Sequence, residues 1–277
     1  MKSILITGGS GTVGQALALH AMRSGVERIC IYSRGEATQA DMRSSVNDAR
    51  LRYFIGDVRD QKRLRRAMDG VDTVFHVAAL KRIEVGVYNP IEMVKTNVDG
   101  AVNVIEAALD AGVQKVIAVS TDKAHEPISP YGYSKALSDS LFLAANNTVA
   151  RGGPTFSVVR LGNVAGSTGS VIPTWRSALA RGQRVAITDA DCTRFWLTPY
   201  QAAAYIFDCA RLKGSIWCPQ DLPAYRLGDL AEALGAETEV IGLHDYEKKH
   251  ELMCDGCSSE NAPRLTVAQL REALCTL

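Results

Sequence analysis

The feature that most constrains the fold is a glycine-rich turn close to the start of the chain. The turn, residues 7–14, follows a short apolar run at residues 4–6 and precedes apolar residues with helical spacing. Glycines let the backbone turn tightly and approach a pyrophosphate, whose charge is stabilised by the positive end of a helix. An ordinary tight turn is the alternative, but the strand before it and the helix after it favour a dinucleotide site. The residues expected to contact the cofactor here are Gly8, Gly11, Thr12, Val13 and Gly14.

The end of the second predicted strand, residues 28–32, bears on which dinucleotide is bound. It is followed by Ser33 and Arg34, at a distance along the chain where an Asp or Glu usually meets a free ribose hydroxyl. A guanidinium instead suits a phosphate, through paired charged hydrogen bonds. We therefore expect NADP rather than NAD, with contacts from both residues. The alternative for Arg34 is a solvated surface charge.

Two further strand ends add candidate cofactor contacts. Asp57 follows a strand at residues 51–55 and either accepts a hydrogen bond from the adenine amine or only forms a turn. Small residues after the strand at 71–77 would let the backbone lie against the cofactor. Nearby, Asp60 is expected to cap a basic helix, and His76 to be a packed core histidine. The candidate contacts are Asp57, Val58, Ala78 and Ala79.

Polar chemistry is concentrated just after the fifth predicted strand. Thr121, Asp122 and Lys123 follow residues 115–119 directly, at the edge of a parallel sheet where ligands bind. Tyr131 and Lys135 are four residues apart on the next helix and so share one face. A cation beside a phenol lowers its pKa. The alternative for Asp122 and Lys123 is a neighbouring surface ion pair.

Composition limits the remaining possibilities. The chain has 277 residues, 47% of them hydrophobic, and a net charge of +1, as in ordinary globular proteins, and it shows no basic excess for nucleic acid. It has no apolar run of about 18 residues and no signal-peptide layout. Seven scattered cysteines fit reduced thiols, so we expect a cytoplasmic protein without a membrane span. Cys254 and Cys257 have the spacing of half a zinc site or a redox pair, but without a second pair we predict no metal.

Strands and helices alternate up to about residue 165. This predicts an α/β fold with a Rossmann-type, doubly wound parallel sheet and a small C-terminal substrate-binding lobe. We expect residues 1–165 to form the NADP-binding domain and residues 166–277 the lobe, from which residues 216–218 could return to the sheet as a strand. One long helix is predicted at residues 91–111, opened by Pro90 and ended by Gly112.

Motifs along most of the chain resemble the extended short-chain dehydrogenase/reductase superfamily. The glycine turn has the pattern TGxxGxxG, and Tyr131 and Lys135 form a YxxxK pair. The resemblance narrows to the inverting UDP-N-acetylglucosamine 4,6-dehydratases. One departure is the run at residues 244–248, HDYEK, which lacks an arginine common in that family. The resembling segments are residues 54–60, 78–81, 88–90, 95–98, 120–124, 156–160, 162–164, 169–173 and 193–196.

The resemblance implies loss of water across carbons 5 and 6 of a UDP-sugar. Tyr131, ionised with the help of Lys135, would take the proton of the carbon-4 hydroxyl, and Thr121 would hold that oxygen. Lys123 would remove the proton from carbon 5, and Asp122 would protonate the departing hydroxyl. A lysine can act as a base at neutral pH only if its surroundings lower its pKa. Reprotonation of carbon 5 from the other face would give the inverted 4-keto-6-deoxy sugar, used to modify glycans or glycoproteins.

The resemblance also implies a homo-oligomer formed through the helices at residues 91 and 131. Alternatives are a retaining 4,6-dehydratase, or a 4-epimerase, which needs no acid–base pair at residues 122 and 123. A non-catalytic NADP-sensing protein on the same fold is a further alternative, against which Tyr131 and Lys135 argue. Trp196 either packs near the diphosphate or belongs to the core. The implied substrate contacts are Lys81, Asn163, Arg194, Ser258, Ser259 and Asn261.

Overall fold

The computed structural model describes residues 1–150, 152–212 and 214–277. In this part of the chain, seven strands form one parallel sheet in the order β3-β2-β1-β4-β5-β6-β9. The order reverses direction on either side of β1, as in a doubly wound sheet, which confirms the predicted fold class. The strands are β1 (Ser3–Thr7), β2 (Arg28–Ser33), β3 (Leu51–Ile55), β4 (Thr73–His76), β5 (Lys115–Thr121), β6 (Thr155–Leu161) and β9 (Ile216–Trp217).

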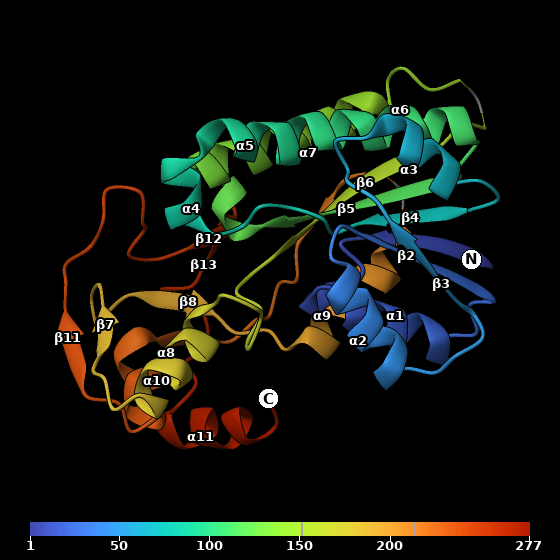
Figure 1. Cartoon of the computed structure of the whole chain (residues 1–277). Helices are drawn as coiled ribbons and strands as arrows, with labels where there is room; N and C mark the ends of the chain where they lie inside the picture. Colours follow the sequence, from blue (N-terminus) through green and yellow to red (C-terminus); the bar gives the residue numbers. More distant parts are fainter. Residues whose placement is uncertain (151, 213) are drawn as a thin grey trace.

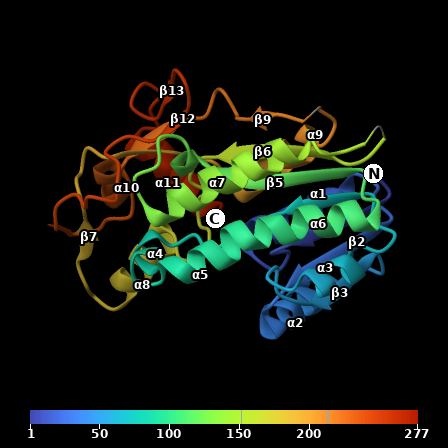
Figure 2. The ribbon, with the colours of Figure 1, turned by 90° about the horizontal axis from the view of Figure 1, so that it is seen from above.

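Helices cover both faces of the sheet (Figure 1). One layer contains α1, α2 and α9, and the other contains α3, α5, α6 and α7. Seen from above, α5 and α6 lie beside α7 along the sheet (Figure 2). The helices are α1 (Thr12–Arg23), α2 (Glu36–Ser45), α3 (Gln61–Ala67), α5 (Pro90–Val94), α6 (Gly100–Ala111), α7 (Pro130–Ala145) and α9 (Pro199–Cys209).

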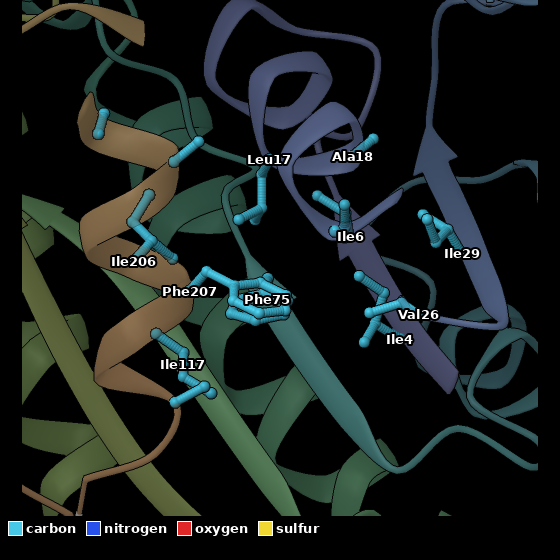
Figure 3. Packing of buried hydrophobic residues seen from close by; sticks show 14 of the residues in the cluster. Ile4, Ile6, Leu17, Ala18, Val26, Ile29, Phe75, Ile117, Ile206 and Phe207 are labelled. Carbon is cyan, nitrogen blue, oxygen red and sulfur yellow. The ribbon is translucent and has the colours of Figure 1, made fainter. Parts of the chain in front are cut away.

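The alternation of side chains along β1 explains why both faces are covered. Ile4 and Ile6 pack into the cluster under α1 and α9, whereas Leu5 packs into the cluster under α3 and α6. Figure 3 shows the first cluster, where Phe75 of β4 and Phe207 of α9 stack with ring centroids 5.9 Å apart. Both faces of the sheet are therefore buried, which leaves the ends of the strands as the place for a ligand site.

The long helix expected at residues 91–111 is interrupted. A π-helical turn, η1 (Lys95–Asp99), separates α5 from α6, and a short helix that we did not predict, α4 (Ile83–Tyr88), precedes them. Within η1 the buried side chain of Asn97 accepts a hydrogen bond from Leu80 N and donates to Leu80 O and to Ser134 Oγ. The π turn thus fixes the loop after β4 against α7.

Three smaller expectations are met around these elements. Asp60 accepts a hydrogen bond from the backbone of Arg63 and caps α3. Gly112 ends α6 in the left-handed conformation, with φ of 68°. His76 is buried in β4 and bonded to Thr7, and burial lowers its pKa to about 3, so it is a neutral core residue.

The C-terminal part forms a lobe with its own apolar core. Trp196 lies in this core, edge-on to Tyr225, so of its two predicted roles the structural one is observed. Both α9 and β9 return to the sheet, so residues beyond 165 also build it; the division at residue 165 stays a prediction. The lobe contains α8 (Val171–Ala180), β7 (Val185–Ile187), β8 (Thr193–Phe195), β10 (Ala224–Arg226), α10 (Leu227–Ala233), β11 (Thr238–Val240), β12 (Leu252–Cys254), β13 (Cys257–Ser258) and α11 (Val267–Cys275).

Among the residues that the structure describes, no helix is long and apolar enough to cross a membrane.

Candidate active site

A cavity of about 560 Å³ lies along the edge of the sheet where the parallel strands end. It brings together the ends of β1, β2, β4, β5 and β6 with one face of α7. All residues expected to contact the cofactor line it, although they come from five separate segments. These residues are Gly8, Gly11, Thr12, Val13, Gly14, Ser33, Arg34, Asp57, Val58, Ala78, Ala79, Tyr131 and Lys135.

The glycine turn fits a dinucleotide on steric grounds. Gly8 has φ of +68°, and a Cβ there would lie 2.8 Å from the backbone nitrogen of Ala78. A Cβ on Gly14 would collide with the carbonyl oxygen of Gly8. The turn therefore packs closely on the end of β4, and its other side faces the open cavity. Gly11, the N-cap of α1, offers no side-chain cap, so the first amides of the helix remain available to an anion.

The β2 end of the cavity carries the residues that bear on NADP. The Ser33 hydroxyl accepts hydrogen bonds from Ser10 Oγ and Gln39 Nε2, each at 2.8 Å, and is thereby fixed in position. The side chain of Arg34 is 56% exposed, and its ion pair with Asp57 is long at 3.8 Å. Asp57 is held more closely by Arg59, at 2.7 Å. The guanidinium of Arg34 thus lies at the cavity without a tight partner among the described residues.

The polar residues after β5 form a tightly bonded cluster. The Thr121 hydroxyl donates to Asp122 Oδ1 at 2.9 Å, and the same oxygen lies 3.0 Å from Lys123 Nζ. Lys123 Nζ also donates to Asn163 Oδ1 at 3.3 Å and lies 3.0 Å from Glu251 Oε1. A short 3-10 turn, η2 (Asp122–Ala124), positions these groups, and Thr121 caps it. Asp122 and Lys123 are therefore not a surface ion pair.

Glu251 was not among the site residues expected from the sequence. It lies just before β12, far along the chain from Lys123, yet its carboxylate is buried and contacts that ammonium. The only signal was a run of charged residues at 247–251, and nothing in the run shows which side chain points inward.

Protonation in this cluster differs from the expectation for a lysine base. Burial and the nearby Glu251 raise the pKa of Asp122, although Lys123 opposes this. Burial alone would lower the pKa of Lys123, but Asp122 and Glu251 raise it above its usual value. The two carboxylates thus favour the ammonium form of Lys123, which must lose a proton before it can act as a base.

The redox pair also differs in one respect from the sequence prediction. Burial raises the pKa of Tyr131 to about 12, and the neighbours that lower it most are Lys123 and Thr121. Lys135 donates instead to the carbonyl of Val119 at 2.9 Å, and burial lowers its own pKa against the effect of Asp139. That Lys135 keeps the phenol ionised therefore stays a prediction.

A second cavity of about 260 Å³ adjoins the first, and Lys123 and Asn163 line both. Arg194 lines the second cavity, but its guanidinium is already paired with Glu247 at 2.6 Å and bonded to the carbonyls of Thr193 and Lys249. Lys81 lines the first cavity and donates to Ser167 at 3.1 Å.

The late serine motif does not reach either cavity. Ser259 is fully buried and bonded to Thr193 and to the backbone of Glu251, whereas Ser258 and Asn261 lie outside both linings. As direct substrate contacts, these three residues are not supported by their positions. Ser259 faces inward, where it supports the hairpin of β12 and β13, whereas Asn261 is exposed.

Cys254 and Cys257 face one another across the same hairpin as free thiols. Across residues 1–150, 152–212 and 214–277, no group of three or more His, Cys, Asp or Glu side chains is arranged to hold a metal ion.

Comparison with known proteins places the chain in a family. Residues 4–269 match the family described as polysaccharide biosynthesis protein. The inverting UDP-N-acetylglucosamine 4,6-dehydratase of Campylobacter jejuni (strain 81-176) is 44% identical over 91% of this chain and 77% of its own length. The UDP-glucose 4-epimerase of Rickettsia akari is 39% identical over 90% of this chain and 76% of its own length.

Solved structures share the fold. The X-ray structure of Pen from Bacillus thuringiensis has a TM-score of 0.93 and 30% identity, covering 100% of this chain and 98% of that one. A dTDP-glucose 4,6-dehydratase from Streptomyces venezuelae, solved with NAD, has a TM-score of 0.81 and 23% identity, covering 98% of this chain and 97% of that one. The chain therefore belongs to the polysaccharide biosynthesis protein family, as a dehydratase-type member of the extended short-chain dehydrogenases/reductases and a homologue of the inverting UDP-N-acetylglucosamine 4,6-dehydratases.

Proposed function

We propose that this protein removes water from UDP-N-acetylglucosamine across carbons 5 and 6, with inversion at carbon 5. The observation that carries the proposal is the cluster of Thr121, Asp122 and Lys123, which lies at the cavity beside Tyr131. An oxidoreductase of this fold needs only the tyrosine and its lysine. The amine of Lys123 and the carboxyl group of Asp122, joined by a hydrogen bond, can in addition accept one proton and donate another. The 44% identity to the Campylobacter enzyme supports the same reaction.

The roles proposed for the side chains are those that the family resemblance implies. A bound nicotinamide dinucleotide would supply oxidation at carbon 4, which makes the proton at carbon 5 acidic, and would return the hydride to carbon 6 after water has left. Tyr131 takes the proton of the carbon-4 hydroxyl, and Thr121 holds that oxygen. Lys123, as the free amine left when its own proton passes to Asp122, takes the proton from carbon 5 as the bond between carbon 6 and its hydroxyl breaks, and Asp122 supplies the proton with which that hydroxyl leaves as water.

The raised pKa of Asp122 supports its role as the acid, because a carboxyl group must be protonated to donate. Its side chain is fully buried and does not line the cavity. A proton that leaves it in this geometry passes through Thr121 or Lys123, the two groups bonded to its Oδ1. We therefore propose that Asp122 acts through one of these neighbours.

The experiment that tests the function is turnover of UDP-N-acetylglucosamine in deuterium oxide, with the product followed by mass spectrometry and NMR. Loss of one water, with deuterium at carbon 5 and inverted configuration, is the expected result. Deuterium at carbon 5 with retained configuration would indicate a retaining dehydratase. A product of unchanged mass would indicate a 4-epimerase, the second candidate, which the 39% identity to the Rickettsia enzyme favours. Bound cofactor without turnover would indicate a sensing protein.

We propose NADP as the cofactor, on the position of Arg34. Replacing Arg34 by glutamine is expected to weaken NADP binding relative to NAD by roughly tenfold or more, because a charged hydrogen bond to the extra phosphate is lost. Titration calorimetry with both cofactors measures the ratio. The matched control is Arg66→Gln, which removes the same charge from an exposed position outside the cavity. An unchanged ratio in the Arg34 variant would remove this residue from the phosphate site.

We propose that two copies associate through the layer formed by α4, α5 and α7. Apolar side chains are exposed there, including Tyr88 at 88% and Ile91 at 64%, and a single copy would leave them in water. Light scattering on the purified protein tests this, and a monomer at all concentrations would contradict it.

We also propose that the enzyme works in the cytoplasm and supplies a sugar for glycans or glycoproteins. The family description supports the latter.

A further inference from the structure

The backbone of Glu251 is held in place by buried hydrogen bonds. Its N–H donates to Ser259 Oγ at 2.8 Å, and its carbonyl accepts from Ser259 N at 2.8 Å. Ser259 Oγ is in turn bonded to Thr193 Oγ1 at 2.7 Å, which also bonds His250 Nδ1 at 2.8 Å. The start of β8 and the start of β12 are thus tied together, and Glu251 has little freedom to move.

The side chain of Glu251 reaches from this anchor to the catalytic cluster. It is 2% exposed, and Oε1 lies 3.0 Å from Lys123 Nζ and 3.8 Å from Arg194 Nε. Oε2 makes no hydrogen bond within the described part of the chain. Burying a carboxylate is unfavourable unless it is paired, so such an arrangement points to a role for the charge at this position.

Lys123 consequently has two carboxylates on its ammonium group and one amide. Asp122 Oδ1 lies 3.0 Å away on η2, Glu251 Oε1 lies 3.0 Å away before β12, and Asn163 Oδ1 accepts at 3.3 Å after β6. Three separate elements therefore fix the nitrogen at the wall shared by the two cavities.

We propose that Glu251 is a positioning residue: it holds Lys123 Nζ at the shared wall and sets the pH at which Lys123 becomes a free amine. The part of this inference that concerns the carbon-5 step depends on the proposed function. The coupling between the two side chains does not.

The surrounding charges determine the direction of the effect. Besides Asp122 and Glu251, the charged or titratable groups that face Lys123 are Arg194 on β8, Tyr131 on α7, Tyr225 on β10 and Lys248. Arg194 and Lys248 are cations and disfavour the ammonium, whereas the two carboxylates favour it. If Glu251 loses its charge, Asp122 is the one contacting carboxylate left, so the pKa of Lys123 falls and more free amine is present at a given pH.

A labelling experiment measures this coupling without any turnover. At fixed pH, acetic anhydride reacts with the free amine, and mass spectrometry gives the labelling rate of each lysine. We expect Lys123 to be labelled roughly tenfold faster or more in Glu251→Gln than in the wild type, because removing an opposite charge in contact shifts a pKa by about one to three units. Lys135, which is buried in the same site but held by Val119, serves as the internal reference.

Two variants make the result specific. Glu251→Asp keeps the charge but shortens the side chain, so its effect on Lys123 should be smaller; it also provides the measurement if the glutamine variant does not fold. Glu260→Gln removes an exposed carboxylate that contacts His250, and it should leave the labelling of Lys123 unchanged. Equal labelling of Lys123 in the wild type and in a folded Glu251 variant would overturn the proposal.

The pH profile of the carbon-5 step completes the test. Because the base is the free amine, the rate rises with pH until the pKa of Lys123 is passed. In Glu251→Gln this rising limb should move to lower pH, whereas a merely structural effect would lower the rate at every pH alike. If the wild type does not dehydrate UDP-N-acetylglucosamine, the proposed function fails, and the labelling result still decides whether Glu251 controls Lys123.

Discussion

Replacing Lys123 by arginine is expected to lower the rate of proton exchange at carbon 5 by about two to four orders of magnitude. Arginine keeps the positive charge between Asp122 and Glu251, so the buried ion pairs can still form. A guanidinium is not deprotonated in proteins and cannot accept the proton. The measurement is deuterium incorporation at carbon 5, with cofactor binding followed in parallel.

A second substitution at the same position separates charge from basicity. Lys123→Met removes both the charge and the basic amine. It leaves the carboxylates of Asp122 and Glu251 buried without the ammonium group that pairs with them. Breaking a buried pair by removing one partner costs about 3–5 kcal/mol of stability, so this variant should lose thermal stability as well as exchange, whereas the arginine variant should lose exchange alone. Normal exchange in the arginine variant would show that Lys123 is not the base.

The fold was predictable because its signals are local. The glycine turn, the apolar strands and the polar residues after them lie within short segments, and the parallel sheet brings the strand ends to one edge. For the same reason, all predicted cofactor contacts were found around one cavity. Asp60 as a cap and Gly112 as a helix end are equally local.

What could not be predicted depends on contacts between distant parts of the chain. Glu251 meets Lys123 only because the hairpin of β12 and β13 is folded against β8, and Ser259, which was expected at the substrate, supports that hairpin from inside. Arg194 was expected as a substrate contact, and the structure shows it already paired with Glu247. The protonation of Lys123 and Tyr131 follows from burial and neighbours, neither of which spacing along a sequence can reveal.

Replacing Tyr131 by phenylalanine is expected to lower the rate of oxidation at carbon 4 by about two to four orders of magnitude. The side chain is buried in the wall of the cavity, and phenylalanine keeps its shape, so cofactor binding and folding should persist. The pKa of the phenol is raised to about 12, so below that pH the ionised fraction, and with it the wild-type rate, should rise as pH rises. This rise should be absent in the variant. Tyr133→Phe is the matched control, because Tyr133 lies on the same helix but is 60% exposed and outside the cavity.

The tyrosine and lysine variants together decide whether the two halves of the reaction belong to different side chains. Given the 4-keto sugar instead of the alcohol, Tyr131→Phe should exchange the carbon-5 proton at close to the wild-type rate, because the oxidation is already done. Lys123→Arg should show the opposite pattern, with oxidation retained and exchange lost. If Tyr131→Phe also failed to exchange the 4-keto sugar, the phenol would have to take part in the carbon-5 step itself. Because Lys123 influences the pKa of Tyr131 across the same cavity wall, that outcome would mean one coupled proton network in place of two separate bases.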